Sequence, residues 1–466
     1  MRNAFPQAAP DFDTLARTAP AWSALRPVRI AILGDFGAGA SAGRADTGAL
    51  LAACKPLNVE FDTLEDAMAR LSPAISLPPG PDGRVERMVF RDLDAFHPDT
   101  LCGHPQLFAA PASRSEADTL RGVLHRPDFQ NLEALWRGVD FLLRRLDTGP
   151  ALQVHLFDIG VEALAADLSG AGDPADSALY RLLVAQPSEE PDGGYRYIAA
   201  CYRFDATPAH AELLGSAARI VAHAGARVIA AIAPDAFTDR REPPPAAVQQ
   251  AFAALRAMPD ASALALMAPR FLLRRPYGKK SEPIASFAFE EFTPASGLRG
   301  MLWGHPALLA VSVLARPGAT LAVGDLPFHY FSDGEGDTIA LPCTERLIDA
   351  DTAVLLRGYG INAVMARKGE PLVRLAGLQA VDGSDLAAEV RRAPGVAVAT
   401  PPRDGTLVAA TGDFPPPIED PTQDEDTADL DALLASFAEP DSQPGATPDD
   451  EDAMDPDLKA LLASLI

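Results

Sequence analysis

Between residues 152 and 232 the chain alternates between short apolar runs and longer segments with helical periodicity. The runs LQVHLFD, RYIAACYRF and RVIAAIA have the composition of strands. The segments between them, VEALAADL, SALYRLLVA and AELLGSAARIVAHAG, place apolar residues three and four positions apart. Strands that alternate with helices form parallel sheets, because a helix returns the chain to the edge where the previous strand began. The order predicts an α/β fold with a mostly parallel sheet.

Residues 125–146, HRPDFQNLEALWRGVDFLLRRL, predict one amphipathic helix. Its apolar residues recur at helical spacing, at Phe129, Leu132, Leu135, Trp136, Val139, Leu142, Leu143 and Leu146. Pro127 and Asp128 suit its first turn. Trp136 is therefore expected to anchor the helix in a core. Farther upstream, VRIAILGDF predicts a buried strand that begins at Val28, and FDTLEDAMARL predicts another helix.

The length and the charge distribution predict several structural units. A chain of 466 residues is too long for one compact core, so we expect two or three units after a flexible leader over residues 1–26. The formal charge is −24, and from Asp413 onward sixteen acidic residues stand against one lysine. Residues 401–466 have too little apolar surface to offset the entropy of ordering, which predicts a disordered acidic tail. This balance argues against nucleic acid and anionic membranes as partners.

Two near copies stand inside this tail, DLDALLASF and DLKALLASL. Each places four apolar residues on one helical stripe, namely Leu430, Leu433, Leu434 and Phe437 in the first and Leu458, Leu461, Leu462 and Leu465 in the second. Helices this short are marginal in water. We expect them to fold when they bind a partner that carries a groove, or to pack back on their own chain.

The sequence offers no catalytic constellation, metal site or cofactor motif. Four separated cysteines show no zinc-binding or disulfide spacing, and no Ser-containing nucleophile elbow or His-Glu-x-x-His motif occurs. His155 has no acidic or Cys partner at ligand spacing and is expected to be a surface or interface histidine. No signal peptide or run of about 18 apolar residues is present, so the cytoplasm is the expected location.

Glycines after the first strand raise the alternative of a nucleotide-binding enzyme. Gly34, Gly37, Gly39 and Gly43 lie close together. A Walker motif would end in Gly-Lys-Ser/Thr, whereas this loop ends in Gly43-Arg44-Ala45, and the dinucleotide fingerprint is also incomplete. A flexible loop is the favoured interpretation.

One basic cluster stands out in this acidic chain and comprises Arg270, Arg274, Arg275, Lys279 and Lys280, with Tyr277 among them. Cations beside an aromatic ring could bind a nucleic acid strand. The acidic charge of the chain favours a charged loop that faces a protein partner or an internal carboxylate. Adjacent carboxylates such as Glu290 and Glu291 point apart and are expected to lie on solvated surface.

Several of these segments together resemble one family, the large subunit of the bacterial type VI secretion contractile sheath (ImpC/EvpB/VipB, or TssC). The resemblance begins with the block from Pro127 to Gly138 and continues with APRFLLRRPYG, FAFEE and LWGHPALLA in the family's order, up to about Val381. The motif residues are Pro127, Phe129, Glu133, Trp136, Arg137, Gly138, Pro269, Arg270, Pro276, Tyr277, Gly278, Glu290, Glu291 and Trp303. The resemblance implies that the basic cluster is a structural loop.

The N-terminal part resembles a second family, the small sheath subunit (TssB). The motif Leu-Gly-Asp-Phe matches residues 33–36, Ala-Arg-Leu-Ser-Pro matches residues 69–73, and Asp-x-Phe-His-Pro-Asp matches residues 94–99. The two resemblances imply a fusion of two packed α/β lobes: a small-subunit-like domain over residues 27–123 and a large-subunit-like core over 124–400, followed by the tail over 401–466.

The departures from these families suggest a specialised role. Only about 25 residues separate FHPD from HRPDF, so the long C-terminal helices of a small subunit and the N-terminal linking segment of a large subunit are missing between them. After Val381 the acidic tail replaces the family's C-terminal domain. The resemblance therefore implies a structural, non-enzymatic sheath component that acts as a cap, adaptor or initiator. Its expected partners are small and large sheath subunits, with inner-tube or baseplate proteins as further candidates. The alternative is a divergent subunit that polymerises by other contacts.

Overall fold

The computed structural model describes residues 27–386, apart from 41–42, 45, 78–84, 105–106, 108–114, 171, 191–192, 240, 317 and 333–337. The flexible leader and the acidic tail that the sequence predicts lie outside these residues.

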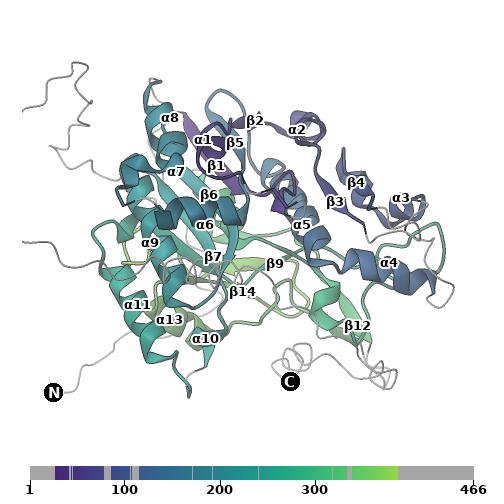
Figure 1. The fold of residues 1–466 in the computed structure, drawn as a ribbon. Coiled ribbons are helices and arrows are strands. Elements are labelled where there is room, and N and C mark those ends of the chain that lie inside the picture. The colour runs from purple at the N-terminus through teal and green to yellow at the C-terminus, as the bar shows by residue number, and fades with distance from the viewer. Residues whose placement is uncertain are drawn as a thin grey trace, which may run out of the picture.

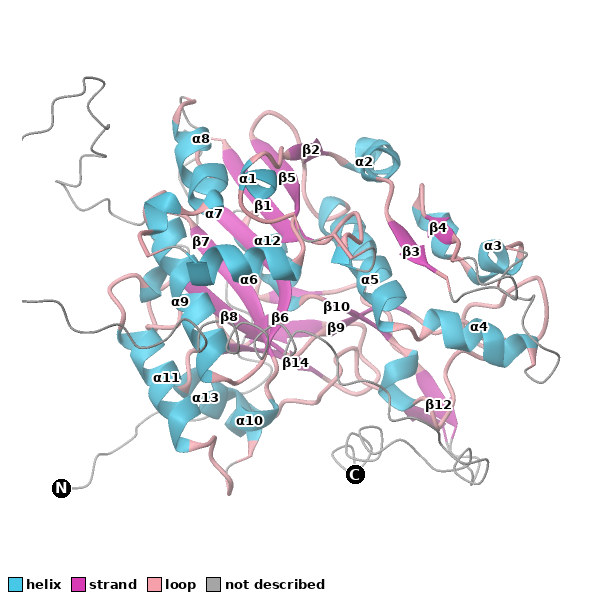
Figure 2. Ribbon diagram, viewed as in Figure 1, coloured by secondary structure: helices cyan, strands magenta, loops and turns pink. Residues whose placement is uncertain are grey.

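One nine-stranded sheet forms the centre of the molecule (Figures 1 and 2). Its strands, in spatial order, are β11 (Ala322–Val323), β15 (Val373–Leu375), β14 (Ile361–Ala366), β8 (Leu264–Ala268), β7 (Arg227–Ile232), β6 (Tyr197–Phe204), β1 (Val28–Gly34), β5 (Leu152–Asp158) and β2 (Leu57–Val59). The six strands from β14 to β5 are parallel to one another, and the strands outside them are antiparallel to their neighbours. The predicted α/β class and mostly parallel sheet are confirmed.

Helices cover both faces of this sheet. On one face lie α5 (Pro127–Leu143) and α12 (Pro306–Leu314), and α12 contacts β6, β7 and β8. The other face carries α6 (Val161–Gly170), α9 (Pro208–Ala222), α11 (Ala246–Ala257) and α13 (Ala350–Gly358), together with a helical segment made of α7 (Ala178–Tyr180), η6 (Arg181–Ala185) and α8 (Gln186–Ser188). The sheet therefore separates two apolar cores, as expected of an α/β fold.

Strand β1 contributes to both cores and lies between β5 and β6. Its residues alternate, so that Ile30 and Ile32 belong to the core under α5 and α12, whereas Leu33 belongs to the opposite core. In Figure 1 this purple strand lies among strands that come much later in the chain. The N-terminal segment was expected to form a lobe of its own. Instead, its first strand completes the sheet of the following segment, because both of its backbone edges are paired.

Most of the rest of the N-terminal segment packs along α5. Its elements there are η3 (Phe61–Thr63), α2 (Leu64–Leu71), β3 (Ala74–Ser76), β4 (Arg87–Val89), η4 (Leu93–Phe96), α3 (Pro98–Cys102) and α4 (Glu116–Leu124). Helix α1 (Ala49–Ala52) instead contacts α7 and places Leu51 in the opposite core. Strands β3 and β4 form a two-stranded sheet. Phe90 and Phe96 stack on each other, and both meet Phe129 of α5 edge to face. This aromatic cluster joins the two parts of the chain.

The remaining described elements are short. They comprise η5 (Pro174–Asp176), α10 (Asp235–Thr238), η7 (Ala261–Ala263), η8 (Gly297–Gly300), the β9–β10 pair (Phe271–Arg274 and Leu302–Gly304) and the β12–β13 pair (Tyr330–Ser332 and Thr338–Ala340). The peptide bond between Ala268 and Pro269, which lies between β8 and β9, is cis. Strand β8 belongs to the large sheet, and β9 pairs with β10.

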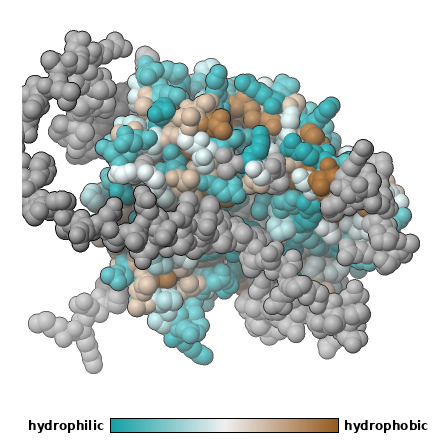
Figure 3. Space-filling view, viewed as in Figure 1, coloured by the Kyte–Doolittle hydropathy of each residue, from teal (hydrophilic) through white to brown (hydrophobic). Residues whose placement is uncertain are grey.

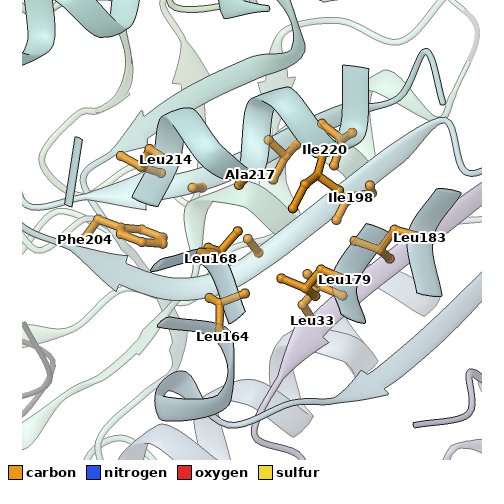
Figure 4. Close-up of a pocket in the computed structure, with 14 residues that line it drawn as sticks. Leu33, Leu164, Leu168, Leu179, Leu183, Ile198, Phe204, Leu214, Ala217 and Ile220 are labelled. Carbon is orange, nitrogen blue, oxygen red and sulfur yellow. The ribbon is translucent and has the colours of Figure 1, made fainter. Parts of the chain in front are cut away.

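A small apolar cavity of about 30 Å³ lies between the sheet and the helices α6 and α9. Figure 4 shows Leu164 and Leu168 facing Leu214 and Ile220 across it, with Leu33 and Ile198 from the strands. A buried water needs two to four polar partners, and every residue that lines this space is apolar. The cavity is a packing defect rather than a polar ligand site.

Trp136 is fully buried, which confirms its predicted role as an anchor. Its indole Nε1 donates to the backbone oxygen of Phe36 at 3.1 Å, and its ring meets the Phe36 ring edge to face at 5.1 Å. The side chain thus attaches α5 to the turn that follows β1. The hydrogen bond also satisfies the one polar atom of the buried ring.

We expect Trp136→Ala to lower the free energy of unfolding by about 3–5 kcal/mol, because it leaves a cavity and an unpaired carbonyl. Thermal melting followed by circular dichroism measures the loss. Tyr330→Ala is the matched control, since Tyr330 is 57% exposed, and it should change stability by about 0.5 kcal/mol or less. Equal melting temperatures for the two variants would contradict the assignment.

Candidate functional site

The family-motif residues surround a buried ion network between α5 and β9. The Nε and Nη2 atoms of Arg274 donate to the two carboxylate oxygens of Glu133 at 2.8 and 3.1 Å. Its Nη1 and Nη2 atoms donate to Glu291 at 2.7 and 3.0 Å. The Glu133 side chain is 0% exposed, that of Glu291 1% and that of Arg274 11%. One guanidinium therefore pairs with two buried carboxylates, each in a bidentate geometry.

Two further groups complete this network. Arg137, one helical turn after Glu133, donates from Nε to Glu133 at 2.7 Å. The backbone N–H of Tyr277 donates to Glu291 at 2.7 Å, and the Tyr277 ring lies under the Arg274 guanidinium at 4.3 Å. Within the basic cluster, Arg274 thus pairs with internal carboxylates, whereas Arg275, Lys279 and Lys280 are exposed.

The pKa values in the network follow from burial and from the uneven number of cations. Desolvation favours the neutral form of Glu133, but Arg274 and Arg137 outweigh it and hold the pKa of this carboxyl below its usual value. Desolvation likewise opposes the charge of Arg274, yet the two carboxylates raise its pKa well above normal. For Glu291, which pairs with only one arginine, burial dominates and raises the pKa. The network is a structural ion cluster in which both carboxylates are buried, while the Arg137 side chain remains 23% exposed.

Close helix packing positions the α5 side of the network. A Cβ atom at Gly138 would lie 2.6 Å from Cδ1 of Leu308 in α12, so any larger residue would displace the Leu308 side chain. Pro127 occupies the first turn of α5, as predicted, and the buried Phe129 follows it. The motif residues of α5 therefore set its position against α12, Phe36 and the aromatic cluster.

The other motif residues stabilise the segment from β8 to β10. Pro269 forms the cis bond, and the side chain of Arg270 pairs with Glu345 at 2.8 Å. The carbonyl of Pro276 accepts from the Ser281 hydroxyl at 2.5 Å. Trp303 is 8% exposed and donates from Nε1 to the backbone oxygen of Leu298 at 2.9 Å.

Glu290 and Glu291 differ in environment, which corrects the expectation that both lie on solvated surface. Glu290 is exposed and accepts from the backbone N–H of Lys279 at 3.1 Å, while a Cβ atom at Gly278 would collide with its carboxylate. Glu291 is buried beside Arg274. Adjacent residues point to opposite sides, so one carboxylate reaches the network while its neighbour stays outside.

The network's loop also binds the FHPD motif of the N-terminal segment. Asp99 accepts from the backbone N–H groups of Ala285 and Ser286 and from the Ser286 hydroxyl, at 2.7–3.0 Å. The His97 ring meets the Tyr277 ring edge to face at 5.0 Å. These residues were not among the predicted site residues, although Asp99 ends a motif that the sequence had singled out. The two family-like segments therefore meet at their own motifs.

Residues 115–382 match the family model described as EvpB/VC_A0108, tail sheath N-terminal domain (VipB). The chain belongs to this tail sheath family. It is also similar to the type VI secretion system sheath protein TssC1 of Pseudomonas aeruginosa, at 27% identity over 289 residues. That alignment covers 56% of this chain and 57% of TssC1, so the chain spans little more than half the length of this relative.

The matches confirm the resemblance to the large sheath subunit. The matched region begins at residue 115, so β1 and the FHPD motif lie outside it. The resemblance of the N-terminal segment to the small subunit and the domain boundaries remain predictions. The structure nevertheless shows that the sheet of this tail sheath domain includes two strands from outside the matched region, β1 and β2.

In the glycine-rich loop of this sheath-family chain, backbone N–H groups donate hydrogen bonds to the protein's own carboxylates. Asp35 accepts from the N–H groups of Gly39 and Ala40 at 2.6 and 3.0 Å, and Asp158 accepts from that of Gly37 at 2.8 Å. Burial raises the pKa of both Asp35 and Asp158. A phosphate would need these N–H groups and would meet two carboxylates there. These hydrogen bonds also order the loop over residues 34–40, which was expected to be flexible.

His155 on β5 packs against an aromatic ring. His155 is half-buried on β5 and meets the Tyr195 ring edge to face at 5.6 Å, and burial lowers its pKa to about 4. Within the described residues, no group of three or more His, Cys, Asp or Glu side chains could hold a metal ion. Across the same ranges, no helix has the length and apolar character that crossing a bilayer requires.

Proposed function

We propose that this protein is a structural, non-enzymatic and cytoplasmic component of a type VI contractile apparatus. The observation that carries the proposal is the position of β1 between β5 and β6. A small-subunit-like segment and a tail sheath domain then form one folding unit in a single chain. Family membership and the similarity to a type VI sheath protein support the placement in this apparatus.

The connection between the two segments favours a cap, adaptor or initiator over an ordinary sheath subunit. Helix α3 ends at Cys102 and α4 begins at Glu116, which leaves 13 residues between them. A connection this short has no room for the long helices and linking segment that the two resemblances imply at this place. A protein without those arms would bind an existing sheath rather than link successive rings.

Exposed apolar side chains support contact with sheath proteins. Leu50 on α1 is 64% exposed, Phe61 beside α2 is 46% exposed, and Val85 and Val89 at β4 are 55% and 45% exposed. Figure 3 shows small brown patches on an otherwise hydrophilic face, over the region where Figure 1 places α1, β2 and β4. Small and large sheath subunits are the proposed partners, and inner-tube or baseplate proteins are further candidates. The two leucine-bearing islands of the tail are proposed as docking segments.

Purified protein alone is expected to form no tubes under conditions in which small and large sheath subunits assemble. The same protein added to those subunits should appear at tube ends or change the number of tubes. Negative-stain electron microscopy of the three mixtures measures this. Tubes made of this chain alone would instead establish a divergent polymerising subunit. Nucleotide turnover by the purified protein would contradict a purely structural role.

A further inference from the structure

A basic groove of about 530 Å³ lies at the β11 edge of the large sheet. Three arginines line it: Arg144 and Arg145 from the end of α5, and Arg316 from the end of α12. Ala319, Ala322 and Val323 supply an apolar part of the lining. We call this feature the arginine groove. It is unexpected in a chain with a formal charge of −24.

Two of these arginines are bonded to neutral acceptors. Arg145 donates to the backbone oxygen of Gly324 at 3.1 Å and lies over the Phe141 ring at 3.8 Å. Arg316 donates from Nε to the backbone oxygen of Ser312 at 2.8 Å. Among the described residues, neither guanidinium has a carboxylate within ion-pair distance, although Asp325 also lines the groove and, with Asp140, attracts Arg145. Three arginines against one lining carboxylate leave the groove cationic, so an added carboxylate would gain a charge-assisted hydrogen bond.

The third arginine extends the groove toward an exposed aromatic side chain. Arg144 pairs with Asp140 at 2.8 Å, and its side chain remains 57% exposed. Its guanidinium lies over the Phe61 ring at 4.8 Å. The surface beside the groove thus offers apolar area as well as positive charge. Such a surface fits a segment in which acidic residues alternate with leucines.

We propose that the arginine groove binds the acidic tail of this same chain, residues 413–466. Charge complementarity identifies this occupant, because the tail carries sixteen acidic residues and one lysine. Its islands at residues 429–437 and 457–465 place aspartates directly beside leucine stripes. The groove therefore combines the two properties expected of the tail's docking site, a cationic rim and apolar contact area.

Chain length permits this contact within one molecule. The 26 residues between Leu386 and Asp413 can span at most about 90 Å, whereas a folded domain of this size has a radius of gyration of roughly 20 Å. Tethering gives the tail an effective concentration in the millimolar range, which favours it over acidic segments of other molecules. The interaction does not depend on the sheath role, so failure of either proposal would leave the other intact.

Photo-cross-linking in the full-length protein tests the proposal. A benzophenone amino acid replaces Leu433 or Leu461, and mass spectrometry locates the cross-linked residues after irradiation. We expect cross-links to residues 141–145 and 316–325. A mixture of ¹⁵N-labelled and unlabelled chains distinguishes contacts within one molecule from contacts between copies. Cross-links between copies, or cross-links concentrated elsewhere on the domain, would overturn the proposal.

Charge substitutions identify the role of the arginines. The pair Arg144→Glu and Arg316→Glu should reduce the cross-linked fraction about tenfold. The matched control, Lys279→Glu with Lys280→Glu, changes the net charge equally at two other exposed cations and should stay within about twofold. If the reversals lower the melting temperature, Arg144→Gln with Arg316→Gln replaces them. An undiminished yield in the folded glutamine variant, or an equal loss in the lysine control, would disprove the assignment.

Discussion

A protein that lacks residues 1–114 is expected not to fold cooperatively, although it retains the whole region that matches the sheath family. The deletion removes β1, which lies between β5 and β6. Its loss leaves a gap in the sheet and exposes both cores. Burying a Val, Leu or Ile side chain contributes about 1.5–3 kcal/mol, so the four large apolar residues of β1 alone contribute roughly 6–12 kcal/mol. That is comparable to the net stability of a whole protein, about 5–15 kcal/mol. Calorimetry and size-exclusion chromatography measure the outcome.

Two controls distinguish this effect from a general consequence of truncation. Removal of residues 1–26 alone keeps every described element and should leave the melting transition unchanged. Co-expression of residues 27–114 with 115–466 should restore a soluble complex, because the strand can pair without a covalent link. A soluble 115–466 fragment with one sharp melting transition would refute the dependence on β1.

Arg274→Met is expected to destabilise the protein by about 3–5 kcal/mol, because it leaves buried carboxylates without their shared cation. Glu133 retains Arg137, whereas the one remaining donor to Glu291 among the described residues is the backbone N–H of Tyr277. Glu291 should therefore take up a proton in the folded variant. The melting temperature measures the loss of stability, and the loss should shrink at low pH, where a protonated Glu291 no longer carries a buried charge.

The triple variant Glu133→Gln, Arg274→Met, Glu291→Gln separates charge from packing. Removal of all three charges should recover much of the stability that Arg274→Met loses, since buried ion clusters are often replaceable by neutral groups. Lys280→Met, in the same loop but exposed, should have an effect of about 0.5 kcal/mol or less. A triple variant no more stable than Arg274→Met would show that packing, rather than unpaired charge, causes the loss.

The single-chain arrangement has a consequence for assembly. A strand that joins a sheet from a separate subunit must be captured from solution, whereas β1 is tethered to the sheet that it completes. Tethering raises its effective concentration to the millimolar range or above. The two family-like segments are thereby held in a fixed one-to-one ratio.

Local patterns were sufficient to predict the elements that carry the fold. Short apolar runs predicted β5 and β6, and the apolar stripe that includes Trp136 predicted both α5 and its buried face. These signals depend on residues a few positions apart, so they are present in the sequence whatever the rest of the chain does. Helices α4 and α11 were not predicted.

The contacts between distant segments could not be predicted in the same way. Glu133 and Arg274 are 141 positions apart, and Asp99 lies 187 positions before Ser286. Sequence reasoning named the motifs that contain these residues, but not that they would meet, nor that Glu291 would be buried while Glu290 stayed exposed. Those outcomes depend on where β9 and its loop pack against α5.

By itself, the sequence determined the α/β class, the core position of Trp136 and the resemblance to the large sheath subunit, because periodicity and motifs are local properties. Only the tertiary structure decided that β1 lies between β5 and β6 rather than in a lobe of its own. Backbone hydrogen bonds in a sheet are the same for any strand. Strand order therefore depends on how the side chains of all the strands and helices pack on both faces of the sheet. The same packing placed Arg274 of the basic cluster between two buried carboxylates, and it placed three arginines beside an edge strand.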